Sequence, residues 1–363
     1  MSTVPQSIAS PRGSRSILCS VATPDIVAIG FRVWLPLDQE VHKRMRIAIL
    51  GARWAEAEVE ADVLGVPGDE IVIDPGQTTQ AIIDVAGDAE VILAGPRPPF
   101  DADTLEQLSC RGIVRYGVGY DNIDVAAAYR LGISVAYVPD YGTDAVALHA
   151  VSLALAALRR IPQLDRAVKS GSWDFGPARP LHLPAALTVG LIGFGRIGQA
   201  AGALFSNLGF ARTVVFDEYV DAAVAGFEPV SLVELLAQSD VVSLHAPGAG
   251  DGTPLVGPDE MALMKPESVI VNTARGALID TAALVAGLRE GRPAVAALDV
   301  FKPEPPDPEM FAGVLDRVIL TPHMAWYTEE TEIALRTKTA GEAKRILSGE
   351  NPNNPVPLPE EAS

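Results

Sequence analysis

Short runs of apolar residues recur along the chain and alternate with longer segments of mixed polarity. Runs of this length that are apolar throughout predict strands buried on both faces of a parallel sheet. In the first part of the chain, strands are expected at 46–50, 71–73, 91–94, 112–116 and 133–137. Helices are expected between them, at 54–64, 78–86, 103–109 and 123–131. This alternation predicts βαβ units and a parallel sheet.

A second series of strands and helices follows. Its strands are expected at 188–192, 213–216, 240–244, 268–272, 294–298 and 317–320. A helix at 144–160 leads out of the first unit, and a helix at 328–347 is expected to return to it. The longest apolar run, Ala145 to Leu158, contains His149 and is shorter than the roughly 20 residues of a membrane span. The fold class predicted is α/β, with two doubly wound parallel-sheet domains.

Three glycines stand between the strand at 188–192 and a helix at 196–208. Gly193 permits the tight turn out of the strand, Gly195 allows a pyrophosphate to come close to the backbone, and Gly198 lets the helix pack on the sheet. Asp217 ends the next strand, where a carboxylate binds the ribose hydroxyls of NAD and repels the 2′-phosphate of NADP. The alternative is a glycine-rich turn without a ligand, but the surrounding strand–turn–helix pattern favours a site for NAD.

Composition limits the partners. The chain has 363 residues, enough for two domains, and a net charge of −18, which argues against binding to nucleic acid or to an anionic membrane. Its two cysteines give neither a disulfide framework nor a metal-binding spacing, so we expect no metal and a cytoplasmic location. Residues 1–44 are expected to form a poorly structured extension, and 356–363 a frayed tail.

Polar residues that follow the later strands are the candidates for chemistry. Ligands of open parallel sheets bind beyond the carboxyl ends of the strands. Arg275 can clamp a carboxylate in two places, and His323 can give or take a proton near neutral pH. Glu304 can fix the tautomer of that imidazole. Each residue alone has a structural alternative, such as a helix cap or a solvated side chain. Together they are the groups that hydride transfer to a 2-oxo acid requires.

Several motifs resemble one family. They are Gly193-Phe194-Gly195-Arg196-Ile197-Gly198, Ser239 to His245, Met264-Lys265-Pro266, Asn272 to Gly276 with Asp280, Leu298-Asp299-Val300, and Thr321-Pro322-His323. From about Met45 to Pro355 the chain resembles the D-isomer-specific 2-hydroxyacid dehydrogenases. The resemblance implies that Arg275, Glu304 and His323 are catalytic. It also implies a Rossmann NAD domain (143–326) inserted into a split flavodoxin-like substrate domain (45–142 and 327–355), and a homodimer formed through the NAD domains.

The resemblance extends the candidate sites. The residues expected to bind NAD are Gly193, Gly195, Arg196, Ile197, Gly198, Asp217, His245, Ala246, Thr253, Thr273, Ala274 and Asp299. Arg115 to Asp124, Val138 to Tyr141 and His323 to Tyr327 are similar to the C-terminal-binding-protein-like branch, in which the residues matching Arg115 and Trp326 line the substrate pocket. The backbone of Val118 and Gly119 is expected to meet the substrate carboxylate. Arg97 is expected near the substrate mouth, where a second cation would favour a dicarboxylate or phosphorylated substrate; a solvated loop arginine is the alternative.

These features predict an NAD-dependent dehydrogenase or reductase of small D-2-hydroxy and 2-oxo acids. An enzyme for phosphoglycerate or another phosphorylated hydroxy acid is the nearest alternative. An NAD-sensing corepressor-like interaction protein is the alternative from another class. The intact set of Arg275, Glu304 and His323 favours an enzyme, because a pure scaffold has no need of it.

Overall fold

The first half of the described chain forms a five-stranded parallel sheet. The computed structural model describes residues 46–248 and 252–358, so the extension expected at 1–44 and most of the expected tail lie outside the described residues. The strands are β1 (Ile47–Leu50), β2 (Ile71–Asp74), β3 (Val91–Ala94), β4 (Gly112–Arg115) and β5 (Ser134–Ala136). Their order is β2-β1-β3-β4-β5, which is the flavodoxin-like order.

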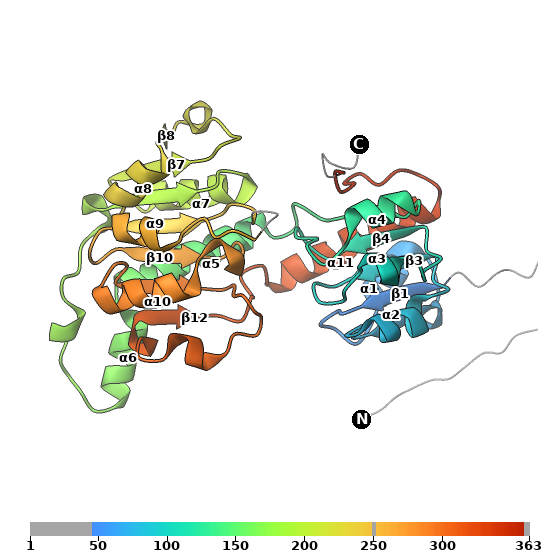
Figure 1. The fold of residues 1–363 in the computed structure, drawn as a ribbon, viewed down its shortest axis with the longest axis horizontal. Coiled ribbons are helices and arrows are strands. Elements are labelled where there is room, and N and C mark those ends of the chain that lie inside the picture. The colour runs from blue at the N-terminus through green and yellow to red at the C-terminus, as the bar shows by residue number, and fades with distance from the viewer. Residues whose placement is uncertain (1–45, 249–251, 359–363) are drawn as a thin grey trace, which may run out of the picture. The chain divides into compact units, whose positions relative to one another are not determined.

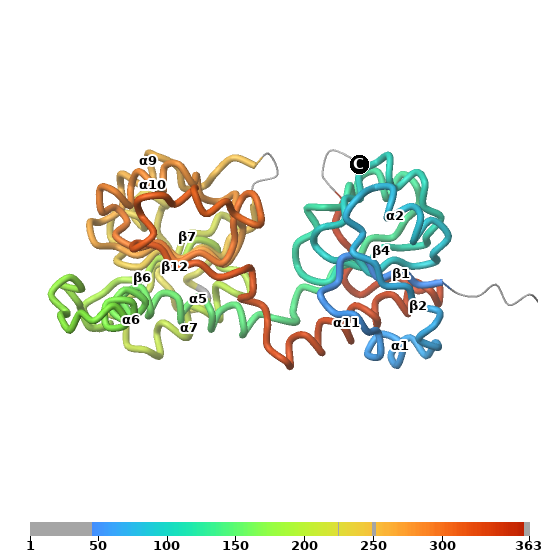
Figure 2. Tube along the Cα trace, turned by 90° about the horizontal axis from the view of Figure 1, so that it is seen from below, coloured from blue at the N-terminus to red at the C-terminus, as the bar shows by residue number. Residues whose placement is uncertain are grey.

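Helices cover both faces of this sheet. One face packs on α2 (Thr79–Ala86), α3 (Ala102–Leu105) and α4 (Val125–Arg130), and the other on α1 (Glu58–Leu64) and α11 (Glu329–Leu347). Figure 2 shows α2 on one side of the strands, and α1 and α11 on the other. Every residue of β1, β3 and β4 is buried. This is why these strands are apolar runs rather than alternating sequences.

The second half forms a seven-stranded parallel sheet (Figure 1). Its strands are β6 (Thr188–Ile192), β7 (Arg212–Phe216), β8 (Glu228–Pro229), β9 (Val241–Leu244), β10 (Val269–Asn272), β11 (Val295–Leu298) and β12 (Val318–Leu320). The order β12-β11-β10-β9-β6-β7-β8 is that of a Rossmann fold. The strand order reverses between β6 and β9, and this is where such folds bind dinucleotides. The predicted α/β class, with two parallel sheets, is confirmed.

The faces of the second sheet also carry helices. One face packs on α5 (Thr143–Leu158) and α7 (Arg196–Asn207), and the other on α8 (Leu232–Gln238), α9 (Pro258–Leu263) and α10 (Thr281–Glu290). Helix α5 is apolar because it lies on this core. Within the part of the chain that the structure describes, no single helix is long and apolar enough to cross a membrane; α5 and the following helix pass that test only as a pair bent by 57°.

Two elements were not expected from the sequence. The helix expected at 144–160 ends at Leu158, and a second helix, α6 (Ile161–Lys169), follows. Arg160 has a left-handed backbone (φ 53°), which breaks the first helix, and Pro162 opens the second, where its missing N–H has no helical partner to lose. The short edge strand β8 contains Pro229 and carries no apolar run, so it gave no strand signal.

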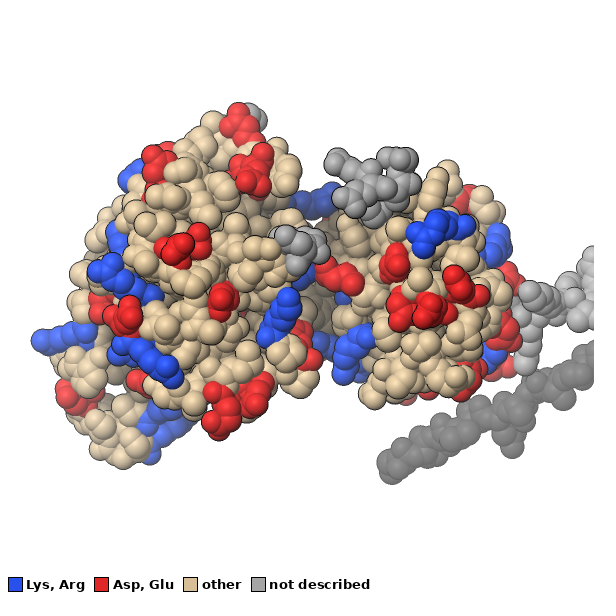
Figure 3. All heavy atoms as spheres, viewed as in Figure 1, with Lys and Arg blue, Asp and Glu red and all other residues tan. Residues whose placement is uncertain are grey.

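Charged side chains of both signs share the surface. On the face of the described residues drawn in Figure 3, Lys and Arg are interspersed with Asp and Glu and form no continuous basic surface.

A buried ion pair fastens the C-terminal helix to the first sheet. The Arg336 guanidinium donates to both carboxylate oxygens of Glu60, with the shortest distance 2.7 Å, and the Tyr116 hydroxyl donates to the same carboxylate at 2.8 Å. Glu60 is fully buried and Arg336 nearly so. The guanidinium carbon also lies 4.8 Å from the centre of the Trp54 ring. Arg336 therefore links α11 to α1, with Tyr116 at the end of β4 bonded to the same carboxylate.

Replacing Arg336 with Met should destabilise the fold, because it leaves the carboxylate of Glu60 buried without its cation. The expected loss in the free energy of unfolding is about 3–5 kcal/mol. Lys169→Met, which breaks the exposed pair between Lys169 and Asp165 on α6, serves as the control and should have a much smaller effect. Urea denaturation of the two variants measures the difference, and equal losses would contradict a special role for the buried pair.

Candidate active site

One cavity of about 790 Å³ collects most of the residues singled out from the sequence. It is lined by loops that follow strands of both sheets. The expected site residues in its lining are Arg115, Val118, Gly119, Gly195, Arg196, Ile197, His245, Ala246, Thr273, Ala274, Arg275, Asp299, Glu304, His323 and Trp326. Gly193, Gly198, Asp217, Thr253 and Arg97 are not part of the lining.

The glycine loop after β6 has the shape that a dinucleotide needs. Gly193 has φ 91° and lies so close to Ala246 that a Cβ would collide with its backbone. A Cβ at Gly198 would collide with the carbonyl oxygen of Gly193. A Cβ at Gly195 would meet nothing within 4 Å, so the backbone there faces open space at the start of α7. The two outer glycines thus serve packing, and the middle one leaves room for a phosphate group at a helix N-terminus.

Asp217, at the end of β7, is held beside this loop. Its Oδ2 accepts a hydrogen bond from the Phe194 N–H at 2.6 Å, and its Oδ1 accepts from the N–H groups of Tyr219 and Val220 at 2.8 Å. Three backbone donors fix the position of the carboxylate. The arrangement fits recognition of the ribose of NAD.

Two buried polar groups near the loop have no partner among the described residues. The Nε2 of His245 lies 2.9 Å from the Ser243 hydroxyl, while its Nδ1 and the Thr273 hydroxyl are buried without a hydrogen bond. Burial lowers the pKa of His245 to about 4, so the ring is neutral at pH 7. Because unpaired buried polar groups are unfavourable, these atoms on the cavity wall fit a polar ligand such as a dinucleotide.

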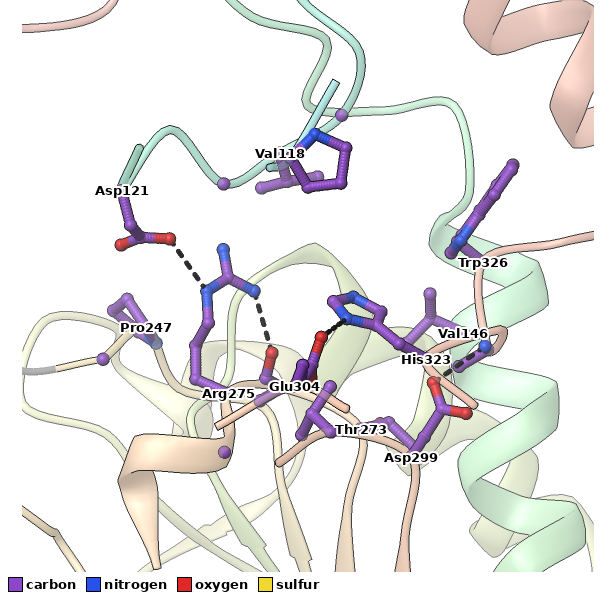
Figure 4. Close-up of a pocket in the computed structure, with 18 of the residues that line it drawn as sticks. Val118, Asp121, Val146, Pro247, Thr273, Arg275, Asp299, Glu304, His323 and Trp326 are labelled. Carbon is purple, nitrogen blue, oxygen red and sulfur yellow. Dashed lines mark hydrogen bonds and ion pairs between the residues drawn. The ribbon is translucent and has the colours of Figure 1, made fainter. Parts of the chain in front are cut away.

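His323 and Glu304 form a hydrogen-bonded pair in the cavity (Figure 4). The Nδ1 of His323 lies 2.7 Å from Glu304 Oε2, and Glu304 Oε1 accepts from the Phe301 N–H at 2.9 Å. Burial acts to raise the pKa of Glu304, but hydrogen bonds from His323 and Phe301 and the charge of Arg53 outweigh it, so the pKa lies below its usual value. Glu304 is therefore an anion at neutral pH and leaves the Nε2 of His323 available to a substrate.

Asp299, at the end of β11, holds the loop that carries His323. Its fully buried carboxylate accepts from the Thr321 hydroxyl at 2.5 Å and from the N–H groups of Met324 and Ala325 at 3.0 and 2.8 Å. These bonds support the left-handed backbone of His323, which has φ 50°. The sequence assigned Asp299 to the cofactor. Its carboxylate is hydrogen-bonded to the loop at 321–325, and its contact with a cofactor stays a prediction.

A histidine on α5 completes this network. The Nε2 of His149 lies 3.1 Å from the Thr321 hydroxyl and 3.7 Å from Asp299. His149 therefore packs behind the loop that carries His323 and does not enter the cavity lining.

Arg275 lies in a turn that Asn272 shapes. Asn272, the last residue of β10, donates to the Arg275 carbonyl at 2.8 Å and accepts from the Ala274 N–H at 3.0 Å. The Arg275 side chain donates to Asp121 at 3.3 Å and to the Ala274 carbonyl at 2.8 Å. It also passes so close to Gly119 that a Cβ there would collide with it. Figure 4 shows Arg275 and His323 pointing into the same space.

Arg115, at the end of β4, is a buried cation that also lines the cavity. It donates to the Tyr116 carbonyl, and its Nε is buried without a partner among the described residues. Burial lowers its pKa to about 10, with the charge of Arg275 acting in the same direction. Burial likewise raises the pKa of the neighbouring Tyr141 to about 12. A buried arginine without a carboxylate bonded to it favours an anionic ligand.

Arg53 lines the cavity although the sequence had not singled it out, whereas Arg97 is not in the lining. Arg53 lies in the loop after β1, and its guanidinium carbon is 5.7 Å from the centre of the Trp326 ring. It follows the carboxyl end of β1, where ligands of parallel sheets bind, but no motif in the sequence marks it. Arg97 is exposed and is not one of the lining residues, although its neighbours Gly95 and Pro96 are, so its place near the substrate mouth stays a prediction. Pro98 turns inward beside it, packing near Gly51 and Gly76.

The chain is similar to known dehydrogenases. Residues 151–325 match the model of the family "D-isomer specific 2-hydroxyacid dehydrogenase, NAD binding domain". A D-3-phosphoglycerate dehydrogenase of Methanocaldococcus jannaschii is 37% identical over 80% of this chain, which spans 56% of that relative's length. A glyoxylate reductase of Aeropyrum pernix is 35% identical over 76% of this chain and 85% of its own.

A solved structure shares the fold. The crystal structure of a glyoxylate reductase from Paecilomyes thermophila is 31% identical, with a TM-score of 0.76, and the match covers 86% of this chain and 98% of that one. These likenesses confirm the resemblance drawn from the motifs at the level of the family. They do not specify the C-terminal-binding-protein-like branch, which stays a prediction.

Replacing Asp299 with Asn should loosen the loop that carries His323. An amide offers one acceptor oxygen where the carboxylate offers two, so at least one of the donors from Thr321, Met324 and Ala325 loses its partner. The expected loss in the free energy of unfolding is about 1–3 kcal/mol, with faster hydrogen exchange at the Met324 and Ala325 amides. Thr321→Ser keeps the hydroxyl and is the control. Unchanged exchange in Asp299→Asn would contradict the proposed support.

Proposed function

This chain belongs to the D-isomer specific 2-hydroxyacid dehydrogenase family, and on that premise we propose that it catalyses hydride transfer between NAD(H) and a small D-2-hydroxy acid or 2-oxo acid. The observation that carries the proposal is the placement of Arg275 and the Glu304–His323 pair in one cavity beside the glycine loop. We further propose that residues 45–142 and 327–355 form the substrate domain, and residues 143–326 the NAD domain.

The cofactor site follows from the glycine loop. Gly193, Gly195, Arg196, Ile197 and Gly198 would hold the pyrophosphate, and Asp217 would bind the ribose hydroxyls. The residues next to Asp217 are Glu218, Tyr219 and Val220, none of which could pair with a 2′-phosphate. His245, Ala246, Thr253, Thr273 and Ala274 are proposed as further contacts. When bound, NADH supplies the hydride that reduces the C2 carbonyl.

The chain's own residues bind and protonate the substrate. Arg275 would hold the C1 carboxylate, with Arg115 and the N–H groups of Val118 and Gly119 on the opposite wall. The Nε2 of His323 would give its proton to the carbonyl oxygen as the carbon is reduced. Glu304, bonded to Nδ1, keeps the ring in this orientation and stabilises its protonated form. Trp326 walls the pocket. In the oxidation direction, neutral His323 takes the proton from the hydroxyl group.

Assembly and location are proposed on other observations. Apolar side chains of α6 and of the segment after it are exposed, among them Ile161, Val168, Trp173, Phe175 and Leu183. A surface of this kind fits a protein interface and supports a homodimer through the NAD domains. The cysteine usage and the negative net charge support a cytoplasmic protein that binds neither nucleic acid nor membranes.

A phosphorylated substrate is the second candidate. The similarity to a D-3-phosphoglycerate dehydrogenase and the presence of Arg53 in the cavity favour it. A corepressor-like role finds no comparable support, because the pairing of Glu304 with His323 serves proton transfer.

The proposal is tested by assaying NADH oxidation with a panel of 2-oxo acids that includes glyoxylate, pyruvate and 3-phosphooxypyruvate. At least one should be reduced to its D-2-hydroxy acid, and NADPH should bind more weakly than NADH because Asp217 repels the 2′-phosphate. Fluorescence titration of both reduced cofactors measures the preference. Absence of turnover across the panel would contradict the proposed activity, and equal or tighter binding of NADPH would contradict the role of Asp217.

The pH profile tests the acid–base pair. Reduction needs protonated His323, so kcat/KM for a 2-oxo acid should be high in acid and fall as pH rises, and oxidation should show the reverse. The lowered pKa of Glu304 keeps its carboxylate charged across this limb. Glu304→Gln removes that charge and should move the falling limb of reduction to lower pH, with activity retained in acid. A limb that does not move would remove Glu304 from the mechanism.

A further inference from the structure

Arg53 is a cation in the candidate active site that the proposed mechanism leaves without a role. Residues 51–54, which follow β1, all line the cavity. The Arg53 side chain is exposed and lies over the Trp326 ring, at 5.7 Å from its centre. Trp326 in turn contacts Tyr141 edge to face, with ring centres 6.1 Å apart. These three side chains form one wall, in which the aromatic rings hold the guanidinium at the cavity.

This wall lies where the end of the substrate that is farthest from its C1 carboxylate would be. In Figure 4, His323 lies between Arg275 and Trp326. A substrate with its C1 carboxylate on Arg275 and its C2 oxygen at His323 therefore extends its remaining carbons toward Trp326 and Arg53. The charge of Arg53 also acts on both Glu304 and Tyr141, which is consistent with a guanidinium facing the interior of the cavity.

The acidic groups of the cavity are already engaged by others. Asp121 pairs with Arg275, Glu304 pairs with His323, and Asp299 accepts from the loop at 321–325. Among the residues that the structure describes, no carboxylate lies within ion-pair distance of Arg53. A monocarboxylic substrate would be held by Arg275 and would leave the charge of Arg53 without a partner.

We propose that Arg53, resting on Trp326, binds a second anionic group of the substrate, so that the enzyme prefers 2-oxo and 2-hydroxy acids with a distal carboxylate or phosphate. The inference rests on the proposed function and deepens it by naming the substrate class. Carboxylate and phosphate share the geometry that a guanidinium binds with two hydrogen bonds. Arg53 thereby takes the role that the sequence had suggested for Arg97.

The test compares substrates of matched length with one or two anionic groups. The pairs are 2-oxobutanoate with oxaloacetate, 2-oxopentanoate with 2-oxoglutarate, and hydroxypyruvate with 3-phosphooxypyruvate. In Arg53→Gln, kcat/KM for the preferred dianionic substrate should fall by about 10- to 100-fold, while its monoanionic partner changes little. Arg53→Lys keeps the positive charge but lacks the planar guanidinium. Its kcat/KM for the dianionic substrate should lie between the values of the unaltered protein and of Arg53→Gln. Which of the three pairs contains the preferred substrate shows whether the distal group is a carboxylate or a phosphate.

Binding without turnover gives a second readout. With NADH bound, a D-2-hydroxy acid cannot react, so calorimetry can measure its affinity for the complex directly. For the preferred pair of the kinetic panel, the dianionic hydroxy acid should bind more weakly to Arg53→Gln than to the unaltered protein, and the monoanionic one equally well. Arg130→Gln removes an exposed arginine outside the cavity and is the matched control, and Arg97→Gln tests the other candidate cation.

Three outcomes would overturn the inference. They are an unchanged ratio of dianionic to monoanionic kcat/KM in Arg53→Gln, an equal loss for both members of a pair, and a loss of that ratio in Arg97→Gln instead. Each of these leaves reduction of 2-oxo acids intact in the unaltered protein. Failure of the unaltered protein to reduce any 2-oxo acid while it still binds NADH would instead overturn the proposed function.

Discussion

The carboxylate of Asp299 lies fully buried at the end of β11 and accepts hydrogen bonds from three groups of the loop at 321–325. A buried anion without donors would be strongly unfavourable, so carboxylate and loop stabilise each other. The loop contains His323 in a left-handed conformation that a free chain would rarely adopt. The direction of the imidazole, and with it the contact to Glu304, therefore depends on a residue 24 positions away in sequence that need not touch substrate.

The arginines proposed to bind substrate in the cavity differ in how deeply they are buried. Arg115 is buried and has only backbone oxygen as a bonded partner, whereas Arg275 and Arg53 are more accessible and lie beside Asp121 and Trp326 respectively. Positive charges held at one place in a protein with net charge −18 attract a small anion even though the overall field repels it. For a small anion, the arrangement of these arginines therefore matters more than the net charge of the protein. The net charge by itself predicted only that large polyanions are unsuitable partners.

Most strands were placed within one or two residues, because they are short apolar runs, and the inner strands β1, β3, β9, β10 and β11 are buried throughout. The elements that were missed lack such a signal: β8 is a two-residue edge strand, and α6 is separated from α5 only by the backbone of Arg160. Among the site residues, Arg275, Glu304 and His323 lie in one cavity as expected. Arg53 was not expected because no motif marks it, and Arg97 is exposed while its neighbour Pro98 packs near Gly51 and Gly76.

The α/β class, the glycine loop with Asp217 and the candidate catalytic residues Arg275, Glu304 and His323 could be read from the sequence, because these follow from local periodicity and from residue types at strand ends. Three features depend on the folded chain: which of several loop arginines face the cavity, the hydrogen bonds between Asp299 and the loop that carries His323, and the contact of His149 on α5 with that loop. Those facts depend on the packing of segments far apart in the chain. Side chains one residue apart in a loop point in different directions, and sequence spacing carries no information about that choice.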